Sequence, residues 1–470
     1  MEFNFTNVTF SFLASIVVAV LGIGYPLFLG SIREIDAQYK STRLAKRFKN
    51  ECIFRVYYWV LVSSIAASII APFMMMIFNN VKLNIIIIMV QCIVVFLLVG
   101  QMLWLFRLIH KYYDIEQICR HLDINGEPDN DNGCNEEKLL CAVEIMKYAS
   151  CNGNRYIFEE CKAYLCWAVN KESQRSESDT YDMGRQVQKS FMQIAHYSRD
   201  KDNVYLHNEC VIAECLYSAH PKRFNGENNL EVLWQSLLLM MDTDSTVWFR
   251  DYWRRAVQYY FMDVSNMDDE SEVGTEVIMQ NWEFFKEMHW MVGAALVYYQ
   301  KYEWLRFALF YSSISPVKYP LVPSSFILIM KGMTKIRKML DSVEEGLSVE
   351  KLERQIPCKY QIEIYHEDKE AASMMLKLAS KYFALLVIRL FSVNNYNITH
   401  SEPMDAPSIP ENDSEKYYMG KAAQDLYANI DFWYIDNLIY RLQLPNVPQE
   451  EDVKALLKSC TSKIETPPKK

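Results

Sequence analysis

The sequence predicts an all-α protein with three N-terminal transmembrane helices and a large α-helical cytoplasmic domain, solenoid-like or an irregular bundle. Three apolar runs without Asp, Glu, Lys or Arg lie within the first 105 residues. After them, apolar side chains recur at helical spacing and sustained β-alternation is scarce. The overall hydrophobic fraction of 51% is therefore an average over two parts, the predicted membrane helices in lipid and the predicted helical domain in water.

The first predicted span covers residues Val8 to Ile32. A helix rises about 1.5 Å per residue, so about 20 residues cross a hydrocarbon core. The preceding segment MEFNFTN contains no basic residue, which favours an uncleaved span over a signal peptide. One face carries small side chains that allow close helix packing in lipid: Ser11, Ser15, Ala19 and Gly22.

The next two spans form a predicted hairpin between Val56 and Leu105, with the break NNVKLN between them. Few polar side chains lie at membrane depth. The candidates for a pore lining or for polar contacts between helices are Gln91, Gln101, Ser64 and Ser68. They either line a water-filled path or join helices by hydrogen bonds. Three spans offer few partners to such groups, so we expect a homo-oligomer.

Basic residues predict the topology. Residues 33–55 contain seven basic and three acidic side chains, whereas the segment before the first span has no Lys or Arg. Positive charge marks the cytoplasmic side. We therefore expect a multi-pass protein of the cell (inner) membrane, with its N-terminus outside and its large domain cytoplasmic. The basic residues expected at the surface of the lipid bilayer are Lys40, Arg43, Lys46, Arg47 and Lys49.

The expected organisation has five parts. Residues 1–110 form the membrane domain, with the cytoplasmic connection 33–55, and residues 111–133 form a stalk that extends the third span, and then a linker. Helical domains follow at 134–340 and 341–443, and a short helix and disordered tail at 444–470. The predicted helices lie at about 185–199, 204–219, 229–241, 247–262, 276–289, 292–312, 325–341, 367–396 and 416–443.

No catalytic motif is present. The sequence lacks GxxxxGK[ST], GxSxG, HExxH and a GxGxxG after a strand. The twelve cysteines include no CxxC pair, and the eight histidines are scattered singly. We therefore predict no cofactor, no metal site and no enzymatic activity. The net charge of −9 argues against a large non-specific nucleic-acid surface.

One cluster, WFRDYWRRAVQYYF at 248–261, combines arginines with aromatic residues. Guanidinium groups suit phosphate and aromatic rings suit nucleobases, so a nucleotide or oligonucleotide pocket is one interpretation. The other is a buried amphipathic helix with charges at its margin. The candidate ligand-binding residues are Arg250, Trp253, Arg254, Arg255 and Tyr259.

Three charge-free spans, a basic connection and a helical domain resemble the layout of bacterial anti-phage membrane effectors, such as the channel effector of the Hailong system. The resemblance covers layout only, so it assigns a role to no residue. It implies a homo-oligomeric membrane effector or ion channel gated by its cytoplasmic sensor domain, in anti-phage defence. The alternatives are a membrane-anchored scaffold that binds a protein partner and a membrane-associated enzyme with an unrecognised site.

Overall fold

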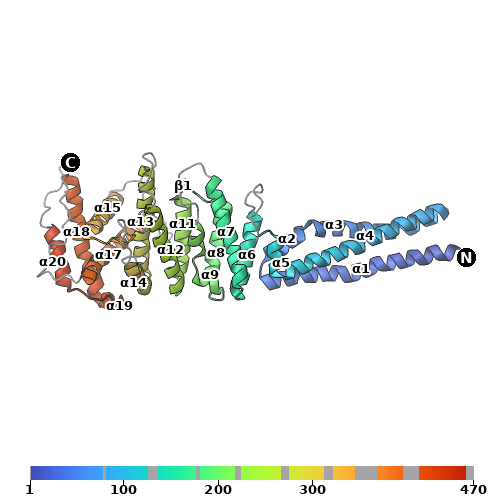
Figure 1. Ribbon diagram of the computed structural model, residues 1–470, viewed down its shortest axis with the longest axis horizontal. Coiled ribbons are helices and arrows are strands. Elements are labelled where there is room, and N and C mark those ends of the chain that lie inside the picture. The colour runs from blue at the N-terminus through green and yellow to red at the C-terminus, as the bar shows by residue number, and fades with distance from the viewer. Residues whose placement is uncertain are drawn as a thin grey trace. The chain divides into compact units, whose positions relative to one another are not determined.

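The computed structural model describes residues 2–77, 81–124, 136–175, 180–217, 224–265, 275–311, 321–344, 368–394 and 412–461. These residues are almost entirely helical, as predicted (Figure 1). Strands among the described residues are limited to a two-residue parallel pair, in which β1 (Thr180–Tyr181) lies against β2 (Phe224–Asn225). The chain divides into two compact units, Met1–Leu165 and Cys166–Lys470. Of the predicted last part at 444–470, the structure describes residues 444–461, which include the short helix α20 (Glu450–Thr461), and the remaining tail lies outside the described residues.

Three helices of the first unit are long and apolar enough to cross a membrane, which confirms the predicted spans. They are α1 (Glu2–Tyr39), α3 (Cys52–Ile77) and α4 (Val81–Tyr113). Helix α4 packs against both α1 and α3 and lies between them in Figure 1. Their outer faces remain apolar and exposed, with Phe96 79% and Trp59 67% accessible. Such faces suit contact with lipid.

Shorter helices complete the first unit: α2 (Thr42–Asn50), α5 (Ile115–His121) and α6 (Glu136–Cys151), followed by the start of α7 (Arg155–Arg175). Helix α6 contacts α1 and α2, so it belongs with the membrane helices. The expected domain boundary at residues 133–134 differs from this division. The expected stalk is also interrupted, because α4 ends at Tyr113 and Asp114 caps α5.

The second unit is a helical assembly. After α7 its elements are α8 (Arg185–Ser198), α9 (Val204–Asn208), α10 (Val211–Tyr217), α11 (Glu227–Met241), α12 (Thr246–Ser265), α13 (Thr275–Tyr298), α14 (Tyr302–Tyr311), α15 (Phe326–Glu344), α17 (Asp368–Asn394), α18 (Asp413–Tyr434), η2 (Ile435–Asn437), α19 (Leu438–Arg441) and α20. Two predicted helices are divided. The helix at 204–219 breaks between α9 and α10, and the last breaks where Asp436 and Asn437 take positive φ.

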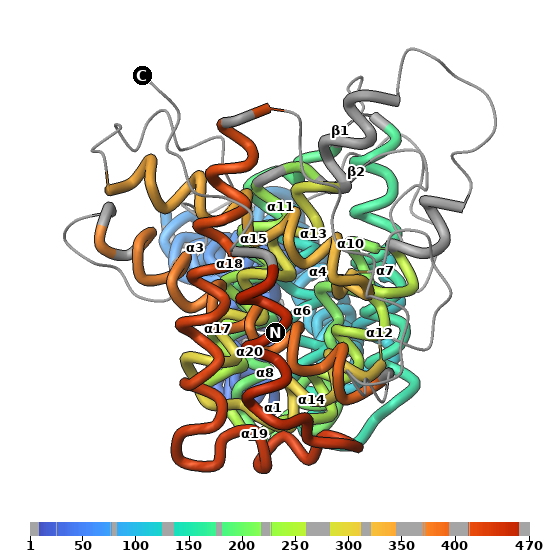
Figure 2. The backbone as a smooth tube through the Cα atoms, turned by 90° about the vertical axis from the view of Figure 1, so that its left-hand side faces the viewer, coloured from blue at the N-terminus to red at the C-terminus, as the bar shows by residue number. Residues whose placement is uncertain are grey.

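Helix α17 is the centre of the C-terminal part. It packs against α13, α15 and α18, and Figure 2 shows it beside α18 and α20. Two glycines allow the close approach. A Cβ added at Gly293 of α13 would lie 2.6 Å from the Tyr382 ring, and one at Gly332 of α15 would lie 2.5 Å from the Phe383 ring. Adjacent aromatic residues of α17 thus occupy space left by glycine on two different helices.

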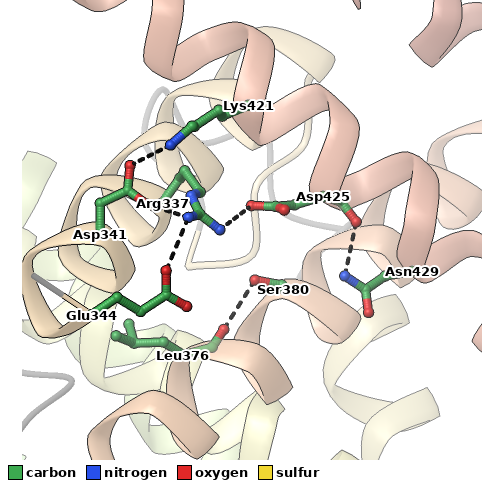
Figure 3. Close-up of polar contacts among 8 residues, drawn as sticks. All are labelled: Arg337, Asp341, Glu344, Leu376, Ser380, Lys421, Asp425 and Asn429. Atoms are coloured by element: carbon green, nitrogen blue, oxygen red, sulfur yellow. Dashed lines mark hydrogen bonds and ion pairs between the residues drawn. The ribbon is translucent and has the colours of Figure 1, made fainter. Parts of the chain in front are cut away.

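A charged network joins α15 to α18 (Figure 3). Asp341 accepts from Arg337 on its own helix, and its second oxygen lies 3.0 Å from the Lys421 ammonium of α18. Arg337 also reaches Asp425 of α18 at 3.4 Å. Because Asp341 is only 9% exposed, these partners compensate a carboxylate that has lost most of its hydration.

Candidate functional site

The polar side chains predicted at membrane depth do not share one environment. The Gln91 amide donates to the Ser68 hydroxyl at 2.7 Å, which joins α4 to α3 within one copy. The Ser64 hydroxyl donates to the carbonyl of Val60 in its own helix at 2.7 Å. Three of the four candidates therefore have partners inside a single chain.

Gln101 is different. Its amide oxygen Oε1 is buried, and it accepts no hydrogen bond in the described part of the chain. Asn84, near the start of α4, has the same property at Oδ1. An unpaired amide away from water costs about 1–3 kcal/mol, so these two oxygens are positions where a further donor would stabilise the protein.

The arginine and aromatic cluster lies on α12, and its aromatic residues from Trp248 to Tyr259 are buried in the core. Trp253 is 1% exposed and Tyr259 is 8% exposed. Arg255 lies 2.9 Å from both Asp251 and Glu214, so its charge is balanced by carboxylates. Burial of the rings favours the interpretation of α12 as a core helix over that of a stacking pocket.

Arg250 and Arg254 remain exposed at the surface of α12. Their guanidinium carbons lie 5.5 Å and 6.0 Å from the centre of the Phe307 ring on α14. This geometry is a cation–π contact between neighbouring helices. The two arginines thus have a structural role that requires no ligand.

The five basic residues predicted at the bilayer surface also fall into two groups, exposed side chains and one that forms an ion pair within the protein. Lys40, Arg43, Lys46 and Lys49 are exposed, as a role at the bilayer surface requires. Helix α2 buries Leu44, Ala45 and Phe48 against the protein, which leaves its charged face outward. Arg47 instead contacts the Glu137 carboxylate of α6 at 3.0 Å.

Arg47 belongs to a polar cluster that was not predicted from the sequence. We call it the membrane-proximal junction, and it consists of Arg47, Glu51, Tyr112, His121 and Glu137. The Glu51 carboxylate, between α2 and α3, accepts from the Tyr112 hydroxyl at 2.9 Å and lies 3.1 Å from His121 Nε2. These contacts join the start of α3 to the end of α4 and to α5.

The junction stabilises the Glu51 carboxylate. Its hydrogen bond with His121 lowers the pKa of Glu51, and the Tyr112 hydroxyl acts in the same direction. The sequence contained one indication of this site, because Glu51 is the only acidic residue in the basic stretch from Lys40 to Arg55. Its partners lie 61 and 70 residues away, which no local pattern reveals.

Among the described residues, no group of three or more His, Cys, Asp or Glu side chains is placed to hold a metal ion. Comparison of the chain with protein-family models, with curated proteins and with solved structures finds no match.

Proposed function

We propose that this protein is a homo-oligomeric membrane effector or ion channel, gated by the helical part that follows its membrane helices. The observation that carries the proposal is the buried Gln101 oxygen, which lacks a partner in one copy. In an oligomer this amide accepts from water in a central path or from a second copy. Either arrangement removes the cost of an unpaired polar group in a medium without water.

The surface of the membrane helices supports association between copies. Gly22 and Gly30 of α1 and Gly100 of α4 have open space where a side chain would extend. Small residues on an outer helix face let another helix approach closely, and such faces recur at helix interfaces in lipid. Gly100 lies on α4, the helix that also carries Gln101.

The membrane-proximal junction supports gating. Glu51 holds the first residues of α3 to the last turn of α4, so a change in α5 or α6 acts on both spans. A signal gates a channel only if it favours one arrangement of such an element over another. Because α7 crosses the division between the units as one helix, it provides a covalent route for that change.

Conductance of purified full-length protein in planar bilayers tests the proposal. We expect discrete current steps for the wild type and their loss in Gln101→Leu, because the apolar side chain removes the unpaired amide. Phe96→Leu on the outer face of the same helix is the matched control, and it should conduct like the wild type. Mass photometry in nanodiscs should give more than one copy per particle.

A protein that is monomeric in nanodiscs would contradict the proposal. Wild-type conductance in Gln101→Leu would show that the Gln101 side chain does not line the conducting path. Either result, combined with retained binding of a protein partner, would favour the membrane-anchored scaffold.

A further inference from the structure

A cavity of about 290 Å³ lies between α13 and α15 of the second unit. Each helix lines it with four residues at positions i, i+3, i+4 and i+7, which share one helix face. Pro323, before α15, also contributes. The residues are Glu283, Lys286, Glu287 and Trp290 of α13, and Leu328, Lys331, Gly332 and Lys335 of α15.

Helix α17 explains why the space exists. Both α13 and α15 pack on α17, whose Phe383 ring lies against Gly332. The same ring meets Trp290 edge to face, with 5.2 Å between ring centres. The glycine leaves room beside the indole, and the phenyl ring fixes its position. Packing of Phe383 in the core therefore fixes the apolar part of the cavity.

The charges of the cavity are not balanced. Lys335 pairs with the buried Glu287 across the cavity and lies 3.6 Å from Glu283. Lys286 and Lys331 form no ion pair or hydrogen bond within the described residues. Three lysines against two carboxylates leave an excess positive charge. Burial lowers the pKa of Lys286 more than the nearby charges of Glu283 and Glu287 raise it, so these carboxylates do not fully offset the hydration that the ammonium group has lost.

Trp290 adds a third free donor. Its indole Nε1 is buried and donates to no acceptor in the described part of the chain. An indole nitrogen can only donate, and a buried donor without an acceptor is unfavourable because it has lost its hydrogen bond to water. Two ammonium groups and one indole N–H thus line this space. The only carboxylates among its lining residues are Glu283 and Glu287, which already lie within ion-pair distance of Lys335.

We propose that this cavity binds a small organic anion, a carboxylate or a phosphate ester with a compact apolar body. The anionic group accepts from Lys286, Lys331 and Trp290, while the body lies on Trp290, Pro323 and Leu328. The volume is close to the lower limit for small-molecule sites, which excludes large ligands. The inference depends on neither the membrane helices nor the proposed channel.

Ligand-observed ¹⁹F NMR on the full-length protein in nanodiscs tests this site. The probes are 4-fluorophenyl phosphate and 4-fluorobenzoate, and the neutral comparison is 4-fluorobenzyl alcohol. We expect both anions to bind and the alcohol to bind at least about tenfold more weakly, because the neutral alcohol cannot form the charge-assisted hydrogen bonds that an anion forms with the ammonium groups. The preference between the two anions identifies the acidic group that the site favours.

Variants assign the binding to these residues. Lys286→Gln combined with Lys331→Gln should raise the Kd of the preferred probe about tenfold, and so should Trp290→Phe, which keeps a ring but lacks the donor. Lys338→Gln is the control, because Lys338 lies on α15 outside the cavity, over the Tyr418 ring. Unfolding midpoints by intrinsic fluorescence confirm that each variant is folded.

Three results would overturn the proposal. They are no binding of either anion at about 1 mM, equal binding of the neutral alcohol, or an unchanged Kd in both folded cavity variants. The first would show that the cavity has no affinity for anions, and the second that it is only an apolar crevice. The third would place the anion elsewhere on the protein.

Discussion

His289 of α13 is a buried histidine whose contacts define one protonation state. It is 1% exposed, Nδ1 donates to the carbonyl of Phe285 at 2.7 Å, and Nε2 accepts from the Tyr252 hydroxyl at 2.8 Å. A neutral ring with its proton on Nδ1 satisfies both contacts. Burial lowers the pKa of His289 to about 4, and the bond to Phe285 only partly offsets this.

This lowered pKa predicts a pH dependence of stability. The histidine pKa is about 6.5 in an unfolded chain, so below that pH the unfolded state binds a proton that the folded state excludes. The stabilisation is complete above about pH 6.5 and is lost as the pH falls towards about 4. The free energy of unfolding should fall by up to about 3 kcal/mol across this window. Denaturant unfolding followed by tryptophan fluorescence, at a series of pH values, measures it.

The matched variants are His289→Gln and His196→Gln. His289→Gln should lose most of the slope between pH 6.5 and 4, whereas His196→Gln should keep it, because His196 is exposed on α8. An unchanged slope in His289→Gln would mean that other groups cause the acid sensitivity.

At the same scale, the sequence predicted helix positions better than side-chain partners. It placed Arg254 and Arg255 correctly on one helix but could not separate their roles. Arg255 pairs with Glu214, which is distant in sequence, whereas Arg254 lies over Phe307. Such partners depend on tertiary packing, so a local pattern of arginines and aromatic rings is compatible with both a binding site and a core helix.

At the scale of the elements, the interrupted stalk could have been foreseen. The Asp114 carboxylate accepts from the backbone N–H of Glu116 at 3.0 Å, and the Gln117 side chain donates to it at 2.9 Å. Aspartate with glutamine three residues later is a pattern typical of a helix start. Composition alone favoured one continuous helix, but the capping residues set the boundary.

The glycine contacts of α17 predict the effect of one added methyl group. Gly332→Ala should lower the free energy of unfolding by about 1 kcal/mol. A Cβ at this position would lie 2.5 Å from the fully buried Phe383 ring, and overpacking costs about 1–3 kcal/mol. The higher helix propensity of alanine offsets about 1 kcal/mol of that cost. Denaturant unfolding at neutral pH measures the difference.

Lys331→Ala is the control for Gly332→Ala, because Lys331 is exposed on the same helix and its truncation creates no clash. Its free energy of unfolding should stay within about 0.5 kcal/mol of the wild type. Stabilisation by Gly332→Ala would show that Phe383 moves at little cost and that α17 is not tightly held there.

At the scale of the whole molecule, the membrane spans were predictable and the division into units was not. A charge-free run is a local property, and its length alone indicates a span. The placement of α6 depends on contacts such as the Tyr39 and Tyr148 rings, whose centres lie 4.7 Å apart. Those residues are separated by the whole membrane hairpin, so the boundary could not be read from composition.

The distribution of charge predicts the orientation of the chain in the membrane. Residues 1–110 contain nine basic and four acidic side chains, a net of +5, and the basic ones concentrate between α1 and α3. Because positive loops stay in the cytoplasm, we expect alkaline phosphatase fused after residue 80 to be active, and fusions after residues 50 and 124 to be inactive. Fluorescent-protein fusions at the same positions should give the opposite pattern. The reverse result would place the second unit outside the cytoplasm, where it could not respond to a cytoplasmic signal.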